Sequence, residues 1–160
     1  MKVELSSQPD NAKVWVYQSN LELTDSDLAQ IKEVGDFFLG QWQSHNLPVN
    51  GSIDVYAHRF IFISAFSDED TMCGRAQDSQ MRLIKELESL VTGTLTDRML
   101  VFYQEENKLK SFHFSELKQL LSDNKITSET IVFNSLVATK KEFKNSWNVA
   151  LKNTWLSQFL

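Results

Sequence analysis

The amino-acid sequence predicts an α+β protein built on a ferredoxin-like βαββαβ unit. Two observations carry this prediction: successive segments have the hydrophobic period of a strand or a helix, and these segments follow the order strand, helix, strand, strand, helix, strand. The expected elements span residues 13–17, 24–44, 52–57, 59–66, 76–92 and 98–103. We expect residues 1–104 to form this unit. Because such folds host unrelated activities, the order alone predicts no function.

The first half of the unit begins with a strand and a capped helix. Residues 13–17 are β-branched and aromatic, which is typical of a strand. Thr24 can cap the following helix, and Asp27 can complete a capping box with it. Apolar residues then recur three or four positions apart, at Leu28, Ile31, Val34, Phe38 and Trp42. This spacing predicts one buried helix face.

The next two segments are expected to pair as strands. In residues 52–57 apolar and polar residues alternate, which predicts a half-buried strand. Residues 60–63 are apolar at every position, which predicts a central strand covered on both faces. A second helix follows, with an apolar stripe at Met81, Ile84, Leu87 and Val91. Residues 99–103 then predict the fourth strand of the unit.

Residues 105–160 are expected to form a small appendage that packs on the first unit. Residues 105–108 predict a turn, 109–114 a returning hairpin strand, and 131–133 one more strand, with a short helix after Ser115. The tail is rich in large apolar residues: Phe143, Trp147, Val149, Leu151, Trp155, Leu156 and Phe159. Disordered tails are poor in aromatic residues, so we expect this tail to pack on the protein.

Composition excludes several classes of partner and compartment. The net charge of −5 over 160 residues argues against nucleic acid and against anionic membrane surfaces. No apolar run approaches the ~20 residues of a membrane span. Met1–Leu5 leads directly into a polar segment, so we expect no secretory signal and a cytoplasmic protein. Cys73 is the one cysteine, so no disulfide forms within the chain.

The glycines and histidines predict neither a nucleotide site nor a metal site. A P-loop needs a glycine-rich turn followed by Lys-Ser or Lys-Thr, whereas the five glycines here are isolated and none precedes such a pair. No Gly-x-Gly is present for a dinucleotide. His45, His58 and His113 lie far apart in the sequence, and residues 68–70 are typical of a solvated acidic loop. We therefore expect no cofactor and no metal.

Cys73 is the residue best suited to nucleophilic or redox chemistry. It lies in the segment 71–75, between the expected central strand and the second helix, where the helix dipole and Arg75 favour a thiolate. Gly74 would allow a sharp turn, and Arg75 could instead bind an anion. The alternative, which we favour, is a small packing cysteine. His58 is the histidine that folding could bring near it, but we assign no catalytic residue.

Trp147 and Trp155 are the candidate residues of a binding surface. Together with Phe143 and Phe159 they could form an exposed face, since Trp is enriched at interface hot spots. They could also cover an edge or a face of the sheet. We favour this second interpretation because large exposed apolar patches are rare on monomers.

The chain is similar to a family of short bacterial proteins commonly labelled ABC transporter ATPases. The resemblance covers nearly the whole chain and lies in Lys13–Asn20, Leu23-Thr24, Gln41-Trp42, Cys73–Glu86, Phe133–Val137 and Trp147–Trp155. It implies no verified activity. The label itself implies ATP hydrolysis, which the missing phosphate-binding loop contradicts.

A second resemblance is to a bacterial variant of the GYF-type adaptor domain, within residues 110–133. It lies in Phe112–Leu121, Lys125–Thr127 and Thr130–Val132, and it implies a hairpin, short helix and strand that contact another protein. Lys110-Ser111-Phe112 stands where the glycine and tyrosine that name the domain would be. This departure argues against proline-rich ligands.

Together these patterns predict a cytosolic binding or scaffold protein with a protein partner and no catalytic chemistry. The alternative is a thiol-dependent enzyme or redox sensor that uses Cys73. The sequence leaves the partner and the oligomeric state open.

The missing P-loop generates a direct prediction. Highly purified protein incubated with ATP and magnesium should release no phosphate above the rate of the buffer blank, because no glycine-rich loop and lysine can hold the phosphates. Phosphate release that co-purifies through several columns and scales with protein concentration would contradict this expectation.

Overall fold

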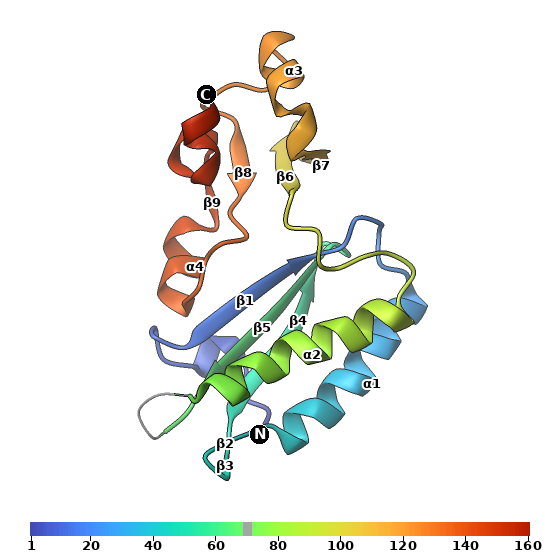
Figure 1. Cartoon of the computed structure of the whole chain (residues 1–160), viewed down its shortest axis with the longest axis vertical. Helices are drawn as coiled ribbons and strands as arrows, with labels where there is room; N and C mark the ends of the chain where they lie inside the picture. Colours follow the sequence, from blue (N-terminus) through green and yellow to red (C-terminus); the bar gives the residue numbers. More distant parts are fainter. Residues whose placement is uncertain (69–71) are drawn as a thin grey trace.

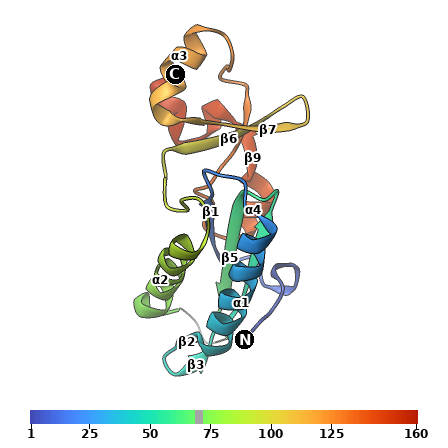
Figure 2. The ribbon, with the colours of Figure 1, turned by 90° about the vertical axis from the view of Figure 1, so that its right-hand side faces the viewer.

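The structure, a computed structural model, describes residues 1–68 and 72–160 and confirms the α+β class. Its helices and strands are β1 (Lys13–Gln18), α1 (Asp25–Gln41), β2 (Gln43–Ser44), β3 (Leu47–Pro48), β4 (Asn50–Tyr56), β5 (Phe60–Phe66), α2 (Gly74–Leu90), β6 (Leu100–Glu105), β7 (Lys108–His113), α3 (Leu117–Ser122), β8 (Ile131–Phe133), α4 (Lys140–Ser146) and β9 (Asn148–Ala150). Short 3₁₀ segments lie at Leu5–Ser7, Phe114–Glu116, Leu151–Asn153 and Trp155–Phe159. Figures 1 and 2 place the β2–β3 hairpin at one end of the molecule and α3 at the other.

The first sheet has the strand order β1-β5-β4, and both pairings are antiparallel. Tyr17 faces Ile61 across β1 and β5, and Ile53 faces Ile63 across β4 and β5. Strands β1 and β4 are therefore parallel, with β5 between them and α1 connecting them. This is the split β-α-β unit that the first half of the sequence predicts.

The second half of the ferredoxin-like prediction is wrong in one respect: β6 does not join the first sheet. It lies instead in a second sheet with the order β7-β6-β8-β9. One edge of β6 pairs with β7 from Leu100↔His113 to Glu105↔Lys108, and the other edge pairs with β8 at Tyr103↔Val132. Because both edges are occupied, β6 has none to offer β1. The first sheet consequently has three strands.

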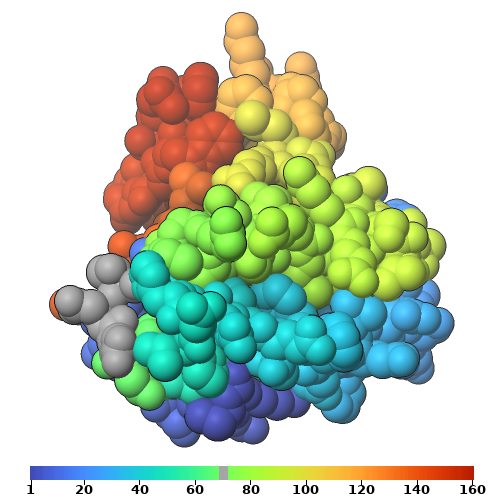
Figure 3. Space-filling model, turned by 60° about the horizontal axis from the view of Figure 1, so that its bottom comes forward, coloured from blue at the N-terminus to red at the C-terminus, as the bar shows by residue number. Residues whose placement is uncertain are grey.

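Helices α1 and α2 lie side by side on one face of the first sheet (Figures 1 and 3). The predicted capping box at the start of α1 is present: the Asp27 N–H donates to the Thr24 hydroxyl and the Thr24 N–H donates to the Asp27 carboxylate. The same carboxylate accepts the Thr92 N–H at 3.1 Å and so ties α1 to the end of α2. A Cβ at Gly35 would lie 3.0 Å from Ile53 Cδ1, so this glycine allows α1 to approach β4 closely.

The opposite face of β5 is covered by an aromatic cluster that joins the two sheets. Its buried members are Phe60 and Phe62 from β5, Phe102 from β6 and Phe133 from β8, with Phe143 and Trp147 packed against them. The Trp147 ring centroid lies 5.1 Å from the centroids of Phe60, Phe62 and Phe133. Aromatic pairs at such distances are stabilising beyond the area that they bury.

A separate core lies within residues 101–156. Its buried members are Val101, Tyr103, Phe112, Leu117, Ile126, Val132, Leu151 and Leu156. Trp155 packs against this core and contacts the rings of Phe114 and Phe159. The C-terminal segment is thus part of the packed structure.

The aromatic cluster predicts where substitutions cost most stability. Trp147→Ala should lower the free energy of unfolding by about 3 kcal/mol, because it removes a large ring from contacts between the two sheets. Urea denaturation followed by circular dichroism measures the change. Phe37→Ala is the matched control, since Phe37 is 68% exposed and its loss should change stability by less than about 0.5 kcal/mol. Equal effects of the two substitutions would contradict the proposed role of Trp147.

Candidate functional site

Cys73 lies at the N-cap of α2, half-buried against the first core. Its backbone N–H donates to the Ser44 hydroxyl at 3.0 Å, which holds the β2–β3 hairpin against the start of α2. The indole N–H of Trp42 donates to the Ala76 carbonyl at 2.8 Å and reinforces the same contact. The sequence-based position of Cys73 at the start of the second helix is therefore correct.

The surroundings of Cys73 lower the pKa of its thiol. The Ser44 hydroxyl contributes most, followed by the backbone N–H of Ala76, and burial opposes both. The backbone N–H groups of His45 and Arg75 add smaller contributions in the same direction. Among these causes Arg75 acts through its backbone, which differs from the side-chain cation that the sequence suggests.

The structure assigns neither a sharp turn to Gly74 nor a side-chain contact with the Cys73 thiol to Arg75. Gly74 has no positive φ, so the sharp turn predicted for it is absent and other residues could adopt its backbone conformation. A Cβ at this position would meet no atom within 4 Å. Arg75 is exposed and lines a hollow of about 330 Å³ between α1 and α2, together with Phe37 and Glu86. No ion pair involves Arg75 in the described part of the chain.

The structure does not bring His58 to Cys73. His58 lies in the turn between β4 and β5, where its Nδ1 contacts the Leu23 carbonyl at 2.9 Å, whereas Cys73 follows the opposite end of β5. Among residues 1–68 and 72–160, no cluster of three or more His, Cys, Asp or Glu side chains is arranged to hold a metal ion. Glu69 and Asp70 of the acidic run, and Thr71 beside Cys73, lie outside the described residues.

Trp147 and Trp155 are both half-buried and contact rings of their own chain, as described above. These contacts correspond to the covering role that we favoured over an exposed binding face. Within the described residues, no helix has the length and the apolar character that crossing a membrane requires.

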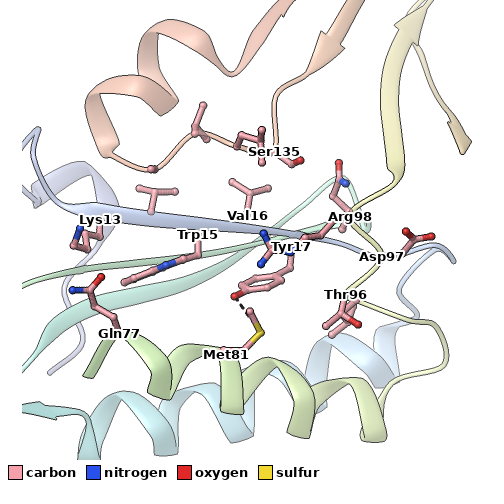
Figure 4. Close-up of a pocket in the computed structure, with 16 residues that line it drawn as sticks. Lys13, Trp15, Val16, Tyr17, Gln77, Met81, Thr96, Asp97, Arg98 and Ser135 are labelled. Atoms are coloured by element: carbon pink, nitrogen blue, oxygen red, sulfur yellow. Dashed lines mark hydrogen bonds between the residues drawn. The ribbon is translucent and has the colours of Figure 1, made fainter. Parts of the chain in front are cut away.

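The structure reveals a site that the sequence patterns do not indicate: a cavity of about 240 Å³ beside β1. Its walls come from β1, from α2, from the connection between α2 and β6, and from the segment before α4. Figure 4 shows Trp15 and Tyr17 pointing from β1 toward α2, and Val16 pointing toward the segment that contains Ser135. The cavity lies on the side of β1 where the fourth strand of a ferredoxin-like sheet would pair.

The edge of β1 that faces this cavity is paired at its two ends and open between them. The Val14 N–H donates to the Ala138 carbonyl at 3.0 Å, and beyond the strand the Asn20 N–H donates to the Thr94 carbonyl at 3.2 Å. Alternation along an antiparallel strand turns the backbone groups of Val16 to this same side. In the described part of the chain, Val16 has no backbone partner there.

Polar side chains surround the open edge. Gln18 is 4% exposed, and its Nε2 donates to the Leu100 carbonyl at 2.8 Å. Its Oε1 is buried and has no hydrogen-bond partner among the described residues. Lys13 and Arg98 also line the cavity, and no ion pair involves either of them within residues 1–68 and 72–160.

This site could not be predicted from the sequence, because it exists only where β6 pairs in the second sheet and leaves the edge of β1 open. One signal was nevertheless present: Gln18 is a polar residue at the end of the β-branched and aromatic run 13–17, and buried glutamine requires partners. Arg98 carries no such signal, since a charged residue before a strand is ordinary. Comparisons of the chain with protein-family models, with curated proteins and with solved structures find no match.

The Cys73 environment predicts the pH dependence of alkylation. Because the pKa of the thiol is lowered, the rate with iodoacetamide should rise with pH around a midpoint below that of free cysteine. Ser44→Ala removes the largest cause, so its midpoint should move to higher pH. The measurement is the alkylation rate by mass spectrometry across a pH series.

Ser79→Ala is the matched control, because the Ser79 hydroxyl donates to the Arg75 carbonyl within α2 and its removal should leave the midpoint unchanged. A thiol that reacts only in denaturant would show that Cys73 is a packing residue. An unchanged midpoint in Ser44→Ala would contradict the role given to Ser44.

Proposed function

We propose that this chain is a cytosolic protein-binding scaffold, and that the cavity beside β1 is its binding site. One observation carries the proposal: an open stretch of strand edge at Val16 faces a cavity between two places where the same edge is paired. Open strand edges are templates for pairing with another chain.

The mode of binding that this geometry supports is the addition of a short extended segment to β1. In such complexes main-chain hydrogen bonds provide affinity and adjacent pockets select side chains. Here the Val16 N–H and C=O offer one donor and one acceptor. Trp15, Tyr17 and Met81 provide an apolar wall for side chains that point toward α2.

The dimensions of the cavity support a peptide over a whole small molecule. Its volume of about 240 Å³ is below the ~300–1,000 Å³ of typical small-molecule pockets. A strand needs only a narrow slot, because its alternate side chains point away from the floor. The hairpin, short helix and strand in residues 100–133, which correspond to the elements implied by the adaptor-domain resemblance, support the same class of function.

A second candidate function rests on Cys73. Its half-buried position at the N-cap of α2 and its lowered pKa favour a reactive thiol, as a thiol-dependent enzyme or redox sensor requires. The alkylation series above tests it, because a thiol that is unreactive at every pH removes the nucleophile.

Val16→Pro tests the proposed binding mode. Proline removes the Val16 N–H, which faces the cavity, and it leaves the β1–β5 hydrogen bonds intact because Val16 does not use its backbone groups toward β5. Phage-displayed linear nonapeptides are selected on the immobilised wild-type protein, and the enriched peptides are measured by fluorescence anisotropy. We expect Val16→Pro to bind them about tenfold more weakly, since a peptide carbonyl loses its partner.

Val16→Ala is the matched control, because it shortens the same side chain and keeps the N–H. It should bind the peptides within about threefold of the wild type, and the amide signals of Val16 and Gln18 should shift in the NMR spectrum of the wild-type complex. Selection that enriches no peptide, or peptides that bind Val16→Pro as well as Val16→Ala, would overturn the proposal.

A further inference from the structure

We infer that the segment bound beside β1 is acidic, with an aspartate or glutamate side chain paired with Arg98. This inference rests on the proposed function and identifies the class of partner. It follows from the charges that line the cavity and from the hydrogen-bonding groups that the cavity leaves without partners.

Two cations that form no ion pair within residues 1–68 and 72–160 lie toward opposite ends of the open edge. Lys13 begins β1, and Arg98 lies in the connection that passes the end of β1 near Tyr17 (Figure 4). The protein as a whole carries a net charge of −5, so this local excess of positive charge runs against the charge of the rest of the surface. Such a site favours negatively charged ligands and disfavours basic ones.

Asp97, the acidic residue among the described residues of the cavity wall, forms no ion pair with Arg98. Asp97 Oδ1 accepts the Met99 N–H at 2.9 Å, and Asp97 Oδ2 lies 3.8 Å from His113 Nε2. Both carboxylate oxygens are thus directed to other groups. The positive charge of Arg98 instead acts on the Tyr17 phenol. Burial raises the pKa of this phenol, and the hydrogen bond to Gln80 and then the charge of Arg98 lower it in part.

The Val16 carbonyl favours a peptide over a simple anion as the ligand. It is an acceptor on the open edge of β1, and phosphate or sulfate would bring further acceptors to it. A ligand that pairs with this edge and with Arg98 must carry N–H donors together with a negative charge, and an extended acidic peptide carries both.

The position of the charge follows from the strand. Because Arg98 lies near the Gln18 end of the slot, the acidic side chain should occupy a fixed place at that end of the bound segment. Lys13 is five residues from Gln18 along β1, which is about 17 Å at the rise of a strand. Lys13 can therefore attract a second acidic residue at the other end of the bound segment. The bound segment is therefore acidic at one fixed position and tolerant of acid at the other end.

The test is a comparison of peptide selections on Arg98 variants. Linear nonapeptides with acetylated and amidated ends, so that terminal charges play no part, are resynthesised from the sets enriched on wild type and on Arg98→Glu. We expect an acidic residue at one fixed position in the wild-type set and a basic residue there in the Arg98→Glu set. Arg98→Gln should weaken the acidic peptides about tenfold, and added salt should weaken them further.

Arg82→Glu is the matched control. Arg82 is an exposed cation on α2 that does not line the cavity, so the same change of charge there should leave the enriched set unaltered. Arg98 is itself exposed and makes no described ion pair, so its variants should fold, which circular dichroism verifies.

The possible outcomes distinguish a failure of the inferred acidic preference from a failure of peptide binding itself. Enriched peptides without an acidic preference, or one set shared by wild type and Arg98→Glu, would overturn the inference and leave peptide binding intact. A failure to enrich any peptide would overturn both. Inorganic phosphate that displaces the acidic peptides at low millimolar concentration would identify a simple anion site. A dimer in sedimentation that Val16→Pro dissociates would identify a second copy of the chain as the occupant.

Discussion

The structure depends on the need to bury both faces of β5. Phe60, Ile61, Phe62 and Ile63 are between 0% and 5% exposed, and in a strand their side chains alternate between the two faces. Ile61 and Ile63 pack under α1 and α2, whereas Phe60 and Phe62 require a cover on the other side. A side chain of this kind contributes about 2 kcal/mol when it is buried. The aromatic cluster is the cover, and residues beyond α2 supply most of it.

This requirement accounts for the open edge beside β1. Phe102 belongs to the cover of Phe60, with ring centroids 4.9 Å apart, so the start of β6 is held at the Phe60 end of β5, on the face away from α1 and α2. A strand in that position cannot also extend the first sheet at β1. Among the described residues, the segment before α4 meets this edge at the bridge between Lys13 and Thr139, which includes the hydrogen bond from Val14 to Ala138. The position of β6 in the second sheet therefore accounts both for the packing of the aromatic cluster and for the cavity beside β1.

Local patterns predicted what depends on local chemistry. The capping box of Thr24 and Asp27, the doubly covered strand at 60–63 and the place of Cys73 before α2 all follow from neighbouring residues. The pairing of β6 could not be predicted in this way, because a short apolar strand has the same pattern in either sheet. Arg98 and Val16 can be recognised as residues of a candidate binding site only when that pairing is known. The candidate site could therefore not be predicted from the sequence.

The two ends of the open edge also limit what the protein can do with it. Continuous exposed strands add further copies without limit, and this is the route to fibres. Here the contacts of Val14 with Ala138 and of Asn20 with Thr94 close the edge at both ends, so pairing stops after a few residues. On the other flank of the sheet, β4 presents its own edge, bordered by the bridge between Lys2 and Gly51. The proposed binding site thus offers the backbone groups of a free strand over a length that is too short for polymerisation.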